Sequence, residues 1–143
     1  MELELALYHT DQRSTGARAV LGRDIPHCAS KAVRKMFNKL SPEYSESCGL
    51  PTLEPADFDW ALHPGGKAII DGVQRSMALS DEHLRASREV YRTRGNSSSP
   101  TVLIVLDMLR SMHTGGREHM VASSFGPGMV IEMAMLRRCG ARE

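Results

Sequence analysis

Apolar residues recur at helical spacing in the first third of the chain. Asp24 is suited to cap a helix, and Pro26 fits the first turn of that helix. The positions that follow place an apolar stripe on one face, made of Ala29, Val33, Met36, Phe37 and Leu40. Residues 41–57 are rich in Pro, Ser, Glu and Gly and lack any periodicity. We therefore predict a helix after residue 24 and a surface loop over 41–57.

Residues 1–17 are patterned less clearly. Residues 2–8 alternate between polar and apolar, as a strand does, but the polar, turn-like segment 11–16 breaks the pattern. A short strand is predicted at 18–21. We interpret 1–17 as a ragged N-terminal segment and 18–143 as one domain, which is the expectation for a chain of 143 residues.

From residue 59 onward the pattern is that of a short strand, a glycine turn and a helix. Trp60–Leu62 predict the strand, and Gly65 and Gly66 predict the turn. The apolar positions after the turn have helical spacing and are Ile69, Ile70, Val73 and Met77. Together these segments predict a βα unit.

A second helix is predicted from Ser80 to Gly95, with Asp81 and Arg85 forming an i,i+4 pair on its exposed face. Residues 97–113 contain an apolar run that is compatible with a buried strand. Apolar residues keep helical spacing over three turns, however, so length favours a helix that is apolar nearly all round and therefore central.

Two strands are predicted at the end of the chain, over residues 118–124 and 129–137. The glycine-proline turn Phe125–Gly128 lies between them. Alternation in the second strand places apolar side chains on one face: Met129, Ile131, Met133 and Met135.

Composition and charge exclude several classes of function. Eighteen basic and seventeen acidic side chains give a formal charge of +1, so no overall field attracts the protein to nucleic acid or anionic lipid. The longest apolar run, Val102–Leu106, is far shorter than the roughly 18 residues of a membrane-spanning helix. The amino terminus is acidic where a signal peptide would be basic. These features predict a cytoplasmic protein without nucleic-acid or membrane partners.

Four cations, Lys31, Arg34, Lys35 and Lys39, lie mostly off the apolar stripe of the first helix, and we interpret them as a solvated face. The three cysteines, Cys28, Cys48 and Cys139, are widely separated and form no C-x-x-C motif, which favours reduced thiols. No pair of histidines has the spacing of a helical metal site, so no metal is expected.

His63 is the most suggestive candidate for chemistry, because it follows a predicted strand and precedes Gly65 and Gly66. A lone histidine is more often structural, but two glycines allow the backbone to approach a substrate closely. Asn96 follows Gly95 in the same way before another predicted helix, where its simplest role is that of an N-cap. There is no G-x-S-x-G, Walker or G-x-G-x-x-G motif.

Five segments together occur in the order typical of one enzyme family: Trp60-Ala-Leu-His-Pro-Gly-Gly66, Leu84-Arg-Ala-Ser-Arg-Glu-Val90, Gly95-Asn-Ser-Ser-Ser99, Leu103-Ile-Val-Leu-Asp107 and Phe125-Gly-Pro-Gly128. On these segments, residues 18–137 resemble the C-terminal half of type III polyketide synthases, the chalcone and stilbene synthase family. The resemblance implies an α/β fold, the C-terminal half of a thiolase-like fold, with a mixed β-sheet and helices on both faces.

The resemblance also implies an acyltransferase that condenses malonyl-CoA onto an acyl-CoA starter, with His63 and Asn96 as catalytic residues. In this family the two side chains stabilise the enolate formed by decarboxylation, and the histidine pairs with a cysteine thiolate. The positions that match the substrate pocket are Ser98, Phe125, Gly126, Pro127 and Gly128. CoA thioesters would be substrates, and no cofactor is implied.

The family's nucleophilic cysteine lies in the first half, and none of the three cysteines here has a matching motif. The resemblance therefore implies a partner, an N-terminal half that supplies the cysteine, and a homodimer in the complete enzyme. The alternative is a non-catalytic truncated relative that acts as a dimerising or scaffolding module. A ketoacyl synthase that starts fatty-acid chains is disfavoured, because its histidine motif lacks the Pro-Gly-Gly found here at 64–66.

Overall fold

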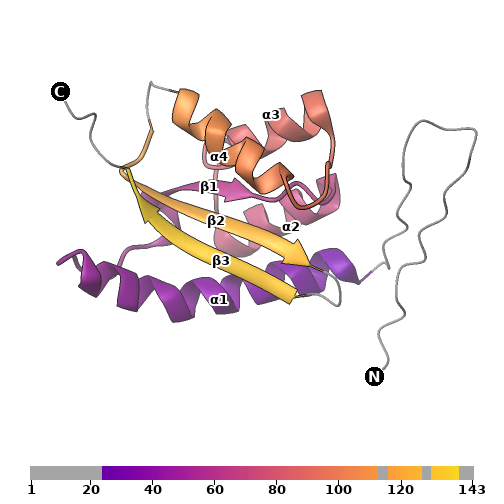
Figure 1. Cartoon of the computed structure of the whole chain (residues 1–143). Helices are drawn as coiled ribbons and strands as arrows, with labels where there is room; N and C mark the ends of the chain where they lie inside the picture. The colour runs from indigo at the N-terminus through magenta and orange to yellow at the C-terminus, as the bar shows by residue number, and fades with distance from the viewer. Residues whose placement is uncertain (1–23, 113–115, 127–129, 139–143) are drawn as a thin grey trace, which may run out of the picture.

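The computed structural model of the chain describes residues 24–112, 116–126 and 130–138 (Figure 1). The elements are α1 (Ile25–Ser47), a single 3-10 turn η1 (Pro55–Asp57), β1 (Phe58–Leu62), α2 (Lys67–Met77), α3 (Arg85–Arg94), α4 (Thr101–Ser111), β2 (His119–Gly126) and β3 (Val130–Arg137). The predicted strand at 18–21 and the segment 1–17 lie outside the described residues.

The three strands form one mixed sheet in the order β1-β2-β3. β1 and β2 are parallel, with Leu62 opposite Ser123, and β2 and β3 are antiparallel, with Ser123 opposite Met133. The long crossover from β1 to β2 contains α2, α3 and α4, as a parallel connection requires. The predicted strands at 60–62, 118–124 and 129–137 are thus confirmed, apart from Met129, which is outside the described residues. The turn predicted over Phe125–Gly128 is wrong in its first half, because Phe125 and Gly126 pair with Ile131 and Val130 and so extend β2.

Helices cover both faces of the sheet, as expected for this fold class (Figure 1). On one face, α1 and α2 pack on the large side chains of β1, and the core there includes Val33, Phe37, Phe58, Trp60, Leu62, Ile70 and Val73. On the other face, α3 and α4 pack on the smaller Ala61, and the core there includes Ala86, Val90, Val105 and Leu109. All five residues of β1 are buried, because strands covered on both faces have no solvent side.

The prediction of a loop over 41–57 is wrong in its first part, because α1 continues to Ser47 and contains Pro42. Ser41 and Ser45 are buried on the inner face of the helix. Ser41 Oγ donates to the carbonyl oxygen of Leu53, and Leu53 N donates to Ser45 Oγ at 2.9 Å. The serines therefore hold the returning chain against α1, and the irregular connection is confined to residues 48–54.

The second predicted helix begins later than expected, at Arg85 instead of Ser80. Residues 81–84 form turns, and Ser80 N, just before them, donates to His83 Nδ1 at 3.0 Å. The predicted Asp81–Arg85 pair does not form. Arg85 Nη1 instead lies 3.2 Å from Asp59 Oδ1, and Asp81 Oδ1 lies 3.7 Å from Arg88 Nε.

The helix predicted over 97–113 is confirmed for Thr101–Ser111, which form α4, but it is not central in the described chain. Its buried residues are Thr101, Val105 and Leu109, while Leu103 is 64% exposed. Among the residues that the structure describes, no helix combines the length and apolarity that crossing a bilayer requires.

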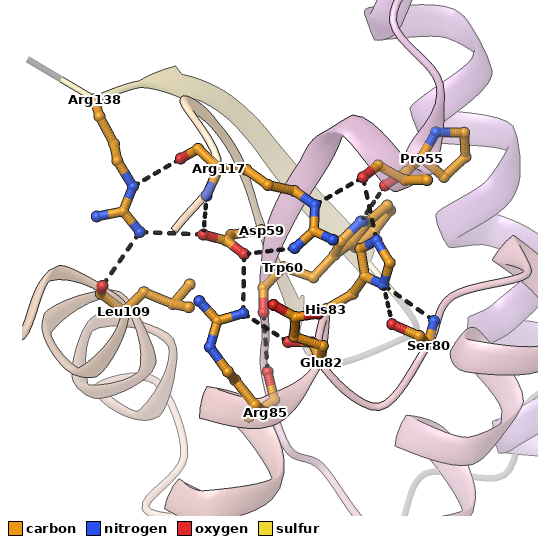
Figure 2. A network of polar contacts seen from close by, with 12 residues as sticks. Pro55, Asp59, Trp60, Ser80, Glu82, His83, Arg85, Leu109, Arg117 and Arg138 are labelled. Atoms are coloured by element: carbon orange, nitrogen blue, oxygen red, sulfur yellow. Dashed lines mark hydrogen bonds and ion pairs between the residues drawn. The ribbon is translucent and has the colours of Figure 1, made fainter. Parts of the chain in front are cut away.

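One fully buried carboxylate, that of Asp59, joins most of these elements at the amino end of β1 (Figure 2). Its Oδ1 lies 3.2 Å from Arg85 Nη1 and 3.3 Å from Arg117 Nη1, and its Oδ2 lies 3.2 Å from Arg138 Nη2. Oδ2 also accepts the backbone N–H of Arg117 at 2.9 Å. Arg138 in turn donates to the carbonyl oxygen of Leu109 at 3.2 Å. The start of α3, the end of α4, the lead into β2 and the exit from β3 therefore converge on one side chain.

We predict that Asp59→Asn lowers the free energy of unfolding by about 3–5 kcal/mol, because it leaves three partly buried guanidinium groups without their counter-charge. Asp107→Asn is the matched control: Asp107 is an exposed partner of Arg110 at 2.7 Å, and its loss should cost about 1 kcal/mol or less. Urea unfolding of both variants measures the difference. Equal destabilisation by the two variants would contradict the central role of Asp59.

Candidate active site

His63 is positioned by the end of the parallel strand pair. It directly follows β1, and its backbone N–H donates to the carbonyl oxygen of Ser123 on β2 at 2.8 Å, which extends the ladder by one bond. The histidine therefore lies at the carboxyl ends of β1 and β2. Ligand sites in open α/β sheets form at this edge.

The His63 side chain is 7% exposed. Its ring lies 6.2 Å from the ring of Phe125, at an interplanar angle of 70°, which is an edge-to-face arrangement. Burial lowers the pKa of His63 from its ordinary value of 6.5. No described residue forms a hydrogen bond with either ring nitrogen. The imidazole is therefore neutral near pH 7 and has one N–H donor to offer.

Gly65 and Gly66 differ in their surroundings. A Cβ at Gly65 would lie 3.1 Å from Ile69 Cδ1, which is a tight contact, and 3.5 Å from His63 Cδ2, which is an ordinary one. Gly65 N also donates to the His63 carbonyl at 2.9 Å. A Cβ at Gly66 would meet nothing within 4 Å. Gly65 therefore has a packing reason to lack a side chain, and Gly66, just before α2, faces open space.

Asn96 lies in the short connection between α3 and α4 and is exposed. It does not cap α4, whose N-cap position is Pro100. Asn96 Oδ1 instead accepts the backbone N–H of Ser98 at 2.8 Å. This bond fixes the amide orientation, so that the two N–H groups of the amide remain available as donors.

The backbone of the connection around Asn96 is held by the side chain of Thr101. The fully buried Thr101 accepts the N–H of Ser97 at 2.9 Å and donates to the Ser98 carbonyl at 2.7 Å. Gly95 and Ser98 both have positive φ, of 68° and 63°. Thr101 was not predicted as a site residue, and its only signal in the sequence is a hydroxyl at the start of an apolar helix.

The helix directions bring Asn96 to the edge where His63 lies. α3 begins beside Asp59, where Arg85 pairs with that carboxylate, and α4 ends beside it, where the Leu109 carbonyl accepts from Arg138. Asp59 is at the amino end of β1. Because the two helices are about 15 Å long, the connection between them lies at the opposite end, which is the carboxyl end of the sheet.

The residues predicted to form a substrate pocket are found at the same edge as far as the structure describes them. Phe125 and Gly126 end β2, and Ser98 lies in the Asn96 connection, where it is exposed. Pro127 and Gly128 are outside the described residues. Two hollows, of about 390 and 270 Å³, lie elsewhere, at α1 with residues 54–56 and at α1 with β3.

One of the two described cysteines, Cys48, is remote from this edge. Cys48 follows α1, one turn after Tyr44, whose hydroxyl bonds to His119 Nδ1 at 2.9 Å at the opposite end of β2. Cys28 is exposed near the start of α1, and no hydrogen bond joins it to His63 in the described residues. Cys139 lies outside the described residues. Within the described ranges, no group of three or more His, Cys, Asp or Glu residues could hold a metal ion.

Comparison with known proteins gives the family. The family described as "Chalcone and stilbene synthases, C-terminal domain" matches residues 7–140. A type III polyketide synthase of Penicillium soppii is 55% identical over 138 residues, which are 90% of this chain and 34% of that protein. An acylalkylpyrone synthase of Aspergillus oryzae is 32% identical over 137 residues, which are 93% of this chain and 34% of that protein.

Solved structures agree with this assignment. A fungal type III polyketide synthase, ORAS, superposes with a TM-score of 0.79 at 36% identity, covering 94% of this chain and 37% of that one. A type III pentaketide synthase from Neurospora crassa gives 0.79 at 37% identity, with the same coverage. The chain spans about a third of the length of these relatives. The expected C-terminal half of a thiolase-like fold is confirmed, and the chain belongs to the chalcone and stilbene synthase family of type III polyketide synthases, as its C-terminal domain.

Proposed function

We propose that this chain contributes His63 and Asn96 to the active site of an acyltransferase that extends an acyl-CoA starter with malonyl-CoA. The observation that carries the proposal is that a buried imidazole and an oriented amide lie at the same carboxyl edge of the sheet. Support also comes from the names of its relatives, a polyketide synthase and an acylalkylpyrone synthase.

The two side chains fit decarboxylation because both offer N–H donors. When the carboxylate of malonyl-CoA leaves as carbon dioxide, the electron pair of the broken bond moves into an enolate with negative charge on the thioester oxygen. Donors already aimed at that oxygen stabilise the charge without reorganisation, and each is typically worth about 3 kcal/mol. The enolate carbon then attacks an acyl thioester, and the thiolate departs.

That acyl thioester needs a cysteine paired with His63, and within the described residues neither Cys28 nor Cys48 forms a hydrogen bond with that imidazole. Relatives are about three times as long, so we propose that a complementary first half supplies the nucleophile. Bringing a thiolate next to His63 would raise the histidine pKa again, opposing the effect of burial. The ion pair would keep the thiol ionised and ready to accept the starter.

In a chain completed with such a first half, we predict that Asn96→Asp lowers malonyl-CoA decarboxylation about a hundredfold or more. Aspartate keeps the oxygen that accepts the Ser98 N–H but loses both donors. His63→Ala should have an effect of the same order. Asn38→Asp, on the exposed side of α1, makes the same chemical change away from the edge and serves as the control. Release of carbon dioxide is the readout, and near-normal rates for both edge variants would refute the assignment.

The buried imidazole predicts a pH dependence of stability. With its folded-state pKa below 6.5, neutral His63 stabilises the fold fully above that pH, and this contribution is lost as the pH falls through the folded-state pKa. When the pH falls from about 7 to about 5, we expect the free energy of unfolding to decrease more for the unaltered chain than for the His63→Gln variant. Urea unfolding at both pH values and NMR titration of the ring provide the test. A ring that titrates at or above 6.5 would contradict it.

The exposed apolar side of α4 predicts that the isolated chain self-associates. Leu103 is 64% exposed, and Ile104, Leu106, Met108 and Met112 are only partly buried. We expect Leu103→Lys to shift the chain toward monomer in analytical ultracentrifugation, because it places a charge in that apolar face. Leu50→Lys, at a 38% exposed position after α1, is the control and should change little. A monomeric unaltered chain would contradict this prediction.

A further inference from the structure

The outer side of α1 carries a stripe of positive charge. Lys31, Arg34, Lys35 and Lys39 follow one another at spacings of three, one and four residues, so they fall on one helical face, and all four are exposed. The polar Asn38, also exposed, lies among them. We call these four cations the cationic stripe. It spans about 12 Å along the helix.

The cationic stripe is not neutralised within the described part of the chain. None of the nine ion pairs found there includes a residue of α1. Acidic side chains do lie near its borders: Asp24 before the helix, Glu43 and Glu46 in the last two turns, and Glu54, which lines the same hollow as Arg34. The net charge of the chain is near zero, but the charge is unevenly distributed. Most described cations outside α1 are paired with a carboxylate, whereas those of α1 are not.

The position of α1 in the fold makes the stripe accessible along its length. The opposite side of the helix, through Val33 and Phe37, packs on the sheet, and the helix forms the outer layer on that face (Figure 1). The stripe contains no aromatic side chain on which bases of a single-stranded nucleic acid could stack. Four exposed cations on one helical face are instead suited to a surface that carries many negative charges.

We propose that the cationic stripe of α1 binds the protein to anionic phospholipid surfaces. Charge complementarity is the basis: clusters of four or more Lys and Arg side chains are attracted by membranes that contain anionic lipid. Each cation near such a surface contributes about a fivefold gain in partitioning. This inference does not depend on the proposed catalytic function, and it revises the expectation from net charge that lipid surfaces are not partners.

The test is sedimentation of the 143-residue chain with vesicles of phosphatidylcholine, with and without phosphatidylserine. We expect binding only to the vesicles with phosphatidylserine, and a loss on raising the salt from about 0.1 M to 1 M, which shortens the Debye length from about 10 to about 3 Å. The variant Lys31→Gln/Arg34→Gln/Lys35→Gln/Lys39→Gln should bind at least about a hundredfold more weakly. The triple change of Lys31, Lys35 and Lys39 to Arg keeps the charges and should bind like the unaltered chain.

A matched control removes the same charge elsewhere: Arg75, Arg92, Arg94 and Arg110 are exposed on the other helices, and their joint replacement by Gln should leave binding within about fivefold. Equal loss in the control and stripe variants would overturn the proposal, because net charge alone would then explain attraction. Salt-insensitive binding to phosphatidylcholine alone would assign lipid contact to the apolar side of α4. Tighter binding of the stripe to a short RNA duplex than to phosphatidylserine vesicles would likewise reject a lipid partner.

Discussion

The buried carboxyl group of Asp59 at the amino end of β1 is the constraint on which the arrangement of the other elements depends. A carboxylate with no exposed surface is stable only if it is surrounded by opposite charge, and three arginines from three separate segments provide it. Because these segments begin α3, precede β2 and follow β3, their common partner fixes the ends of the elements relative to β1. One end of the sheet is thereby closed by ion pairs.

The two candidate catalytic residues lie at the opposite end of the sheet. Once α3 begins and α4 ends at Asp59, the connection that carries Asn96 must lie at the end of the sheet where β1 and β2 terminate, which is also the end that carries His63. Thr101 then sets the shape of that connection, and Oδ1 of Asn96 fixes the direction of its amide. The placement of the two candidate catalytic groups is thus a consequence of a structural ion-pair cluster at the far end of the same strand.

Much of the fold could be predicted from the sequence where the signal is local. The strand and helix around His63 and the helical face of Ile69, Ile70 and Val73 follow from periodicity alone. The errors have tertiary causes. Ser41 and Ser45 resemble loop residues in composition, but their hydroxyls bond across to the chain at Leu53. The start of α3 was misplaced because Arg85 is engaged by Asp59, a residue 26 positions earlier that no local pattern connects to it. α4 was predicted as central from its composition, but its buried face is narrow in the described chain.

The candidate site was predicted from family motifs, and the structure adds its physical basis. Single residues such as His63 or Asn96 are ambiguous in a sequence, and only the fold shows that they share an edge. The account therefore requires that this edge become catalytic when a first half completes it. The most direct test is carbon dioxide release from malonyl-CoA by the chain alone, by the separately expressed first half of the Penicillium soppii relative, and by their mixture. The account predicts release by the mixture only. Turnover by the isolated chain, at a rate that the first half does not increase, would contradict it.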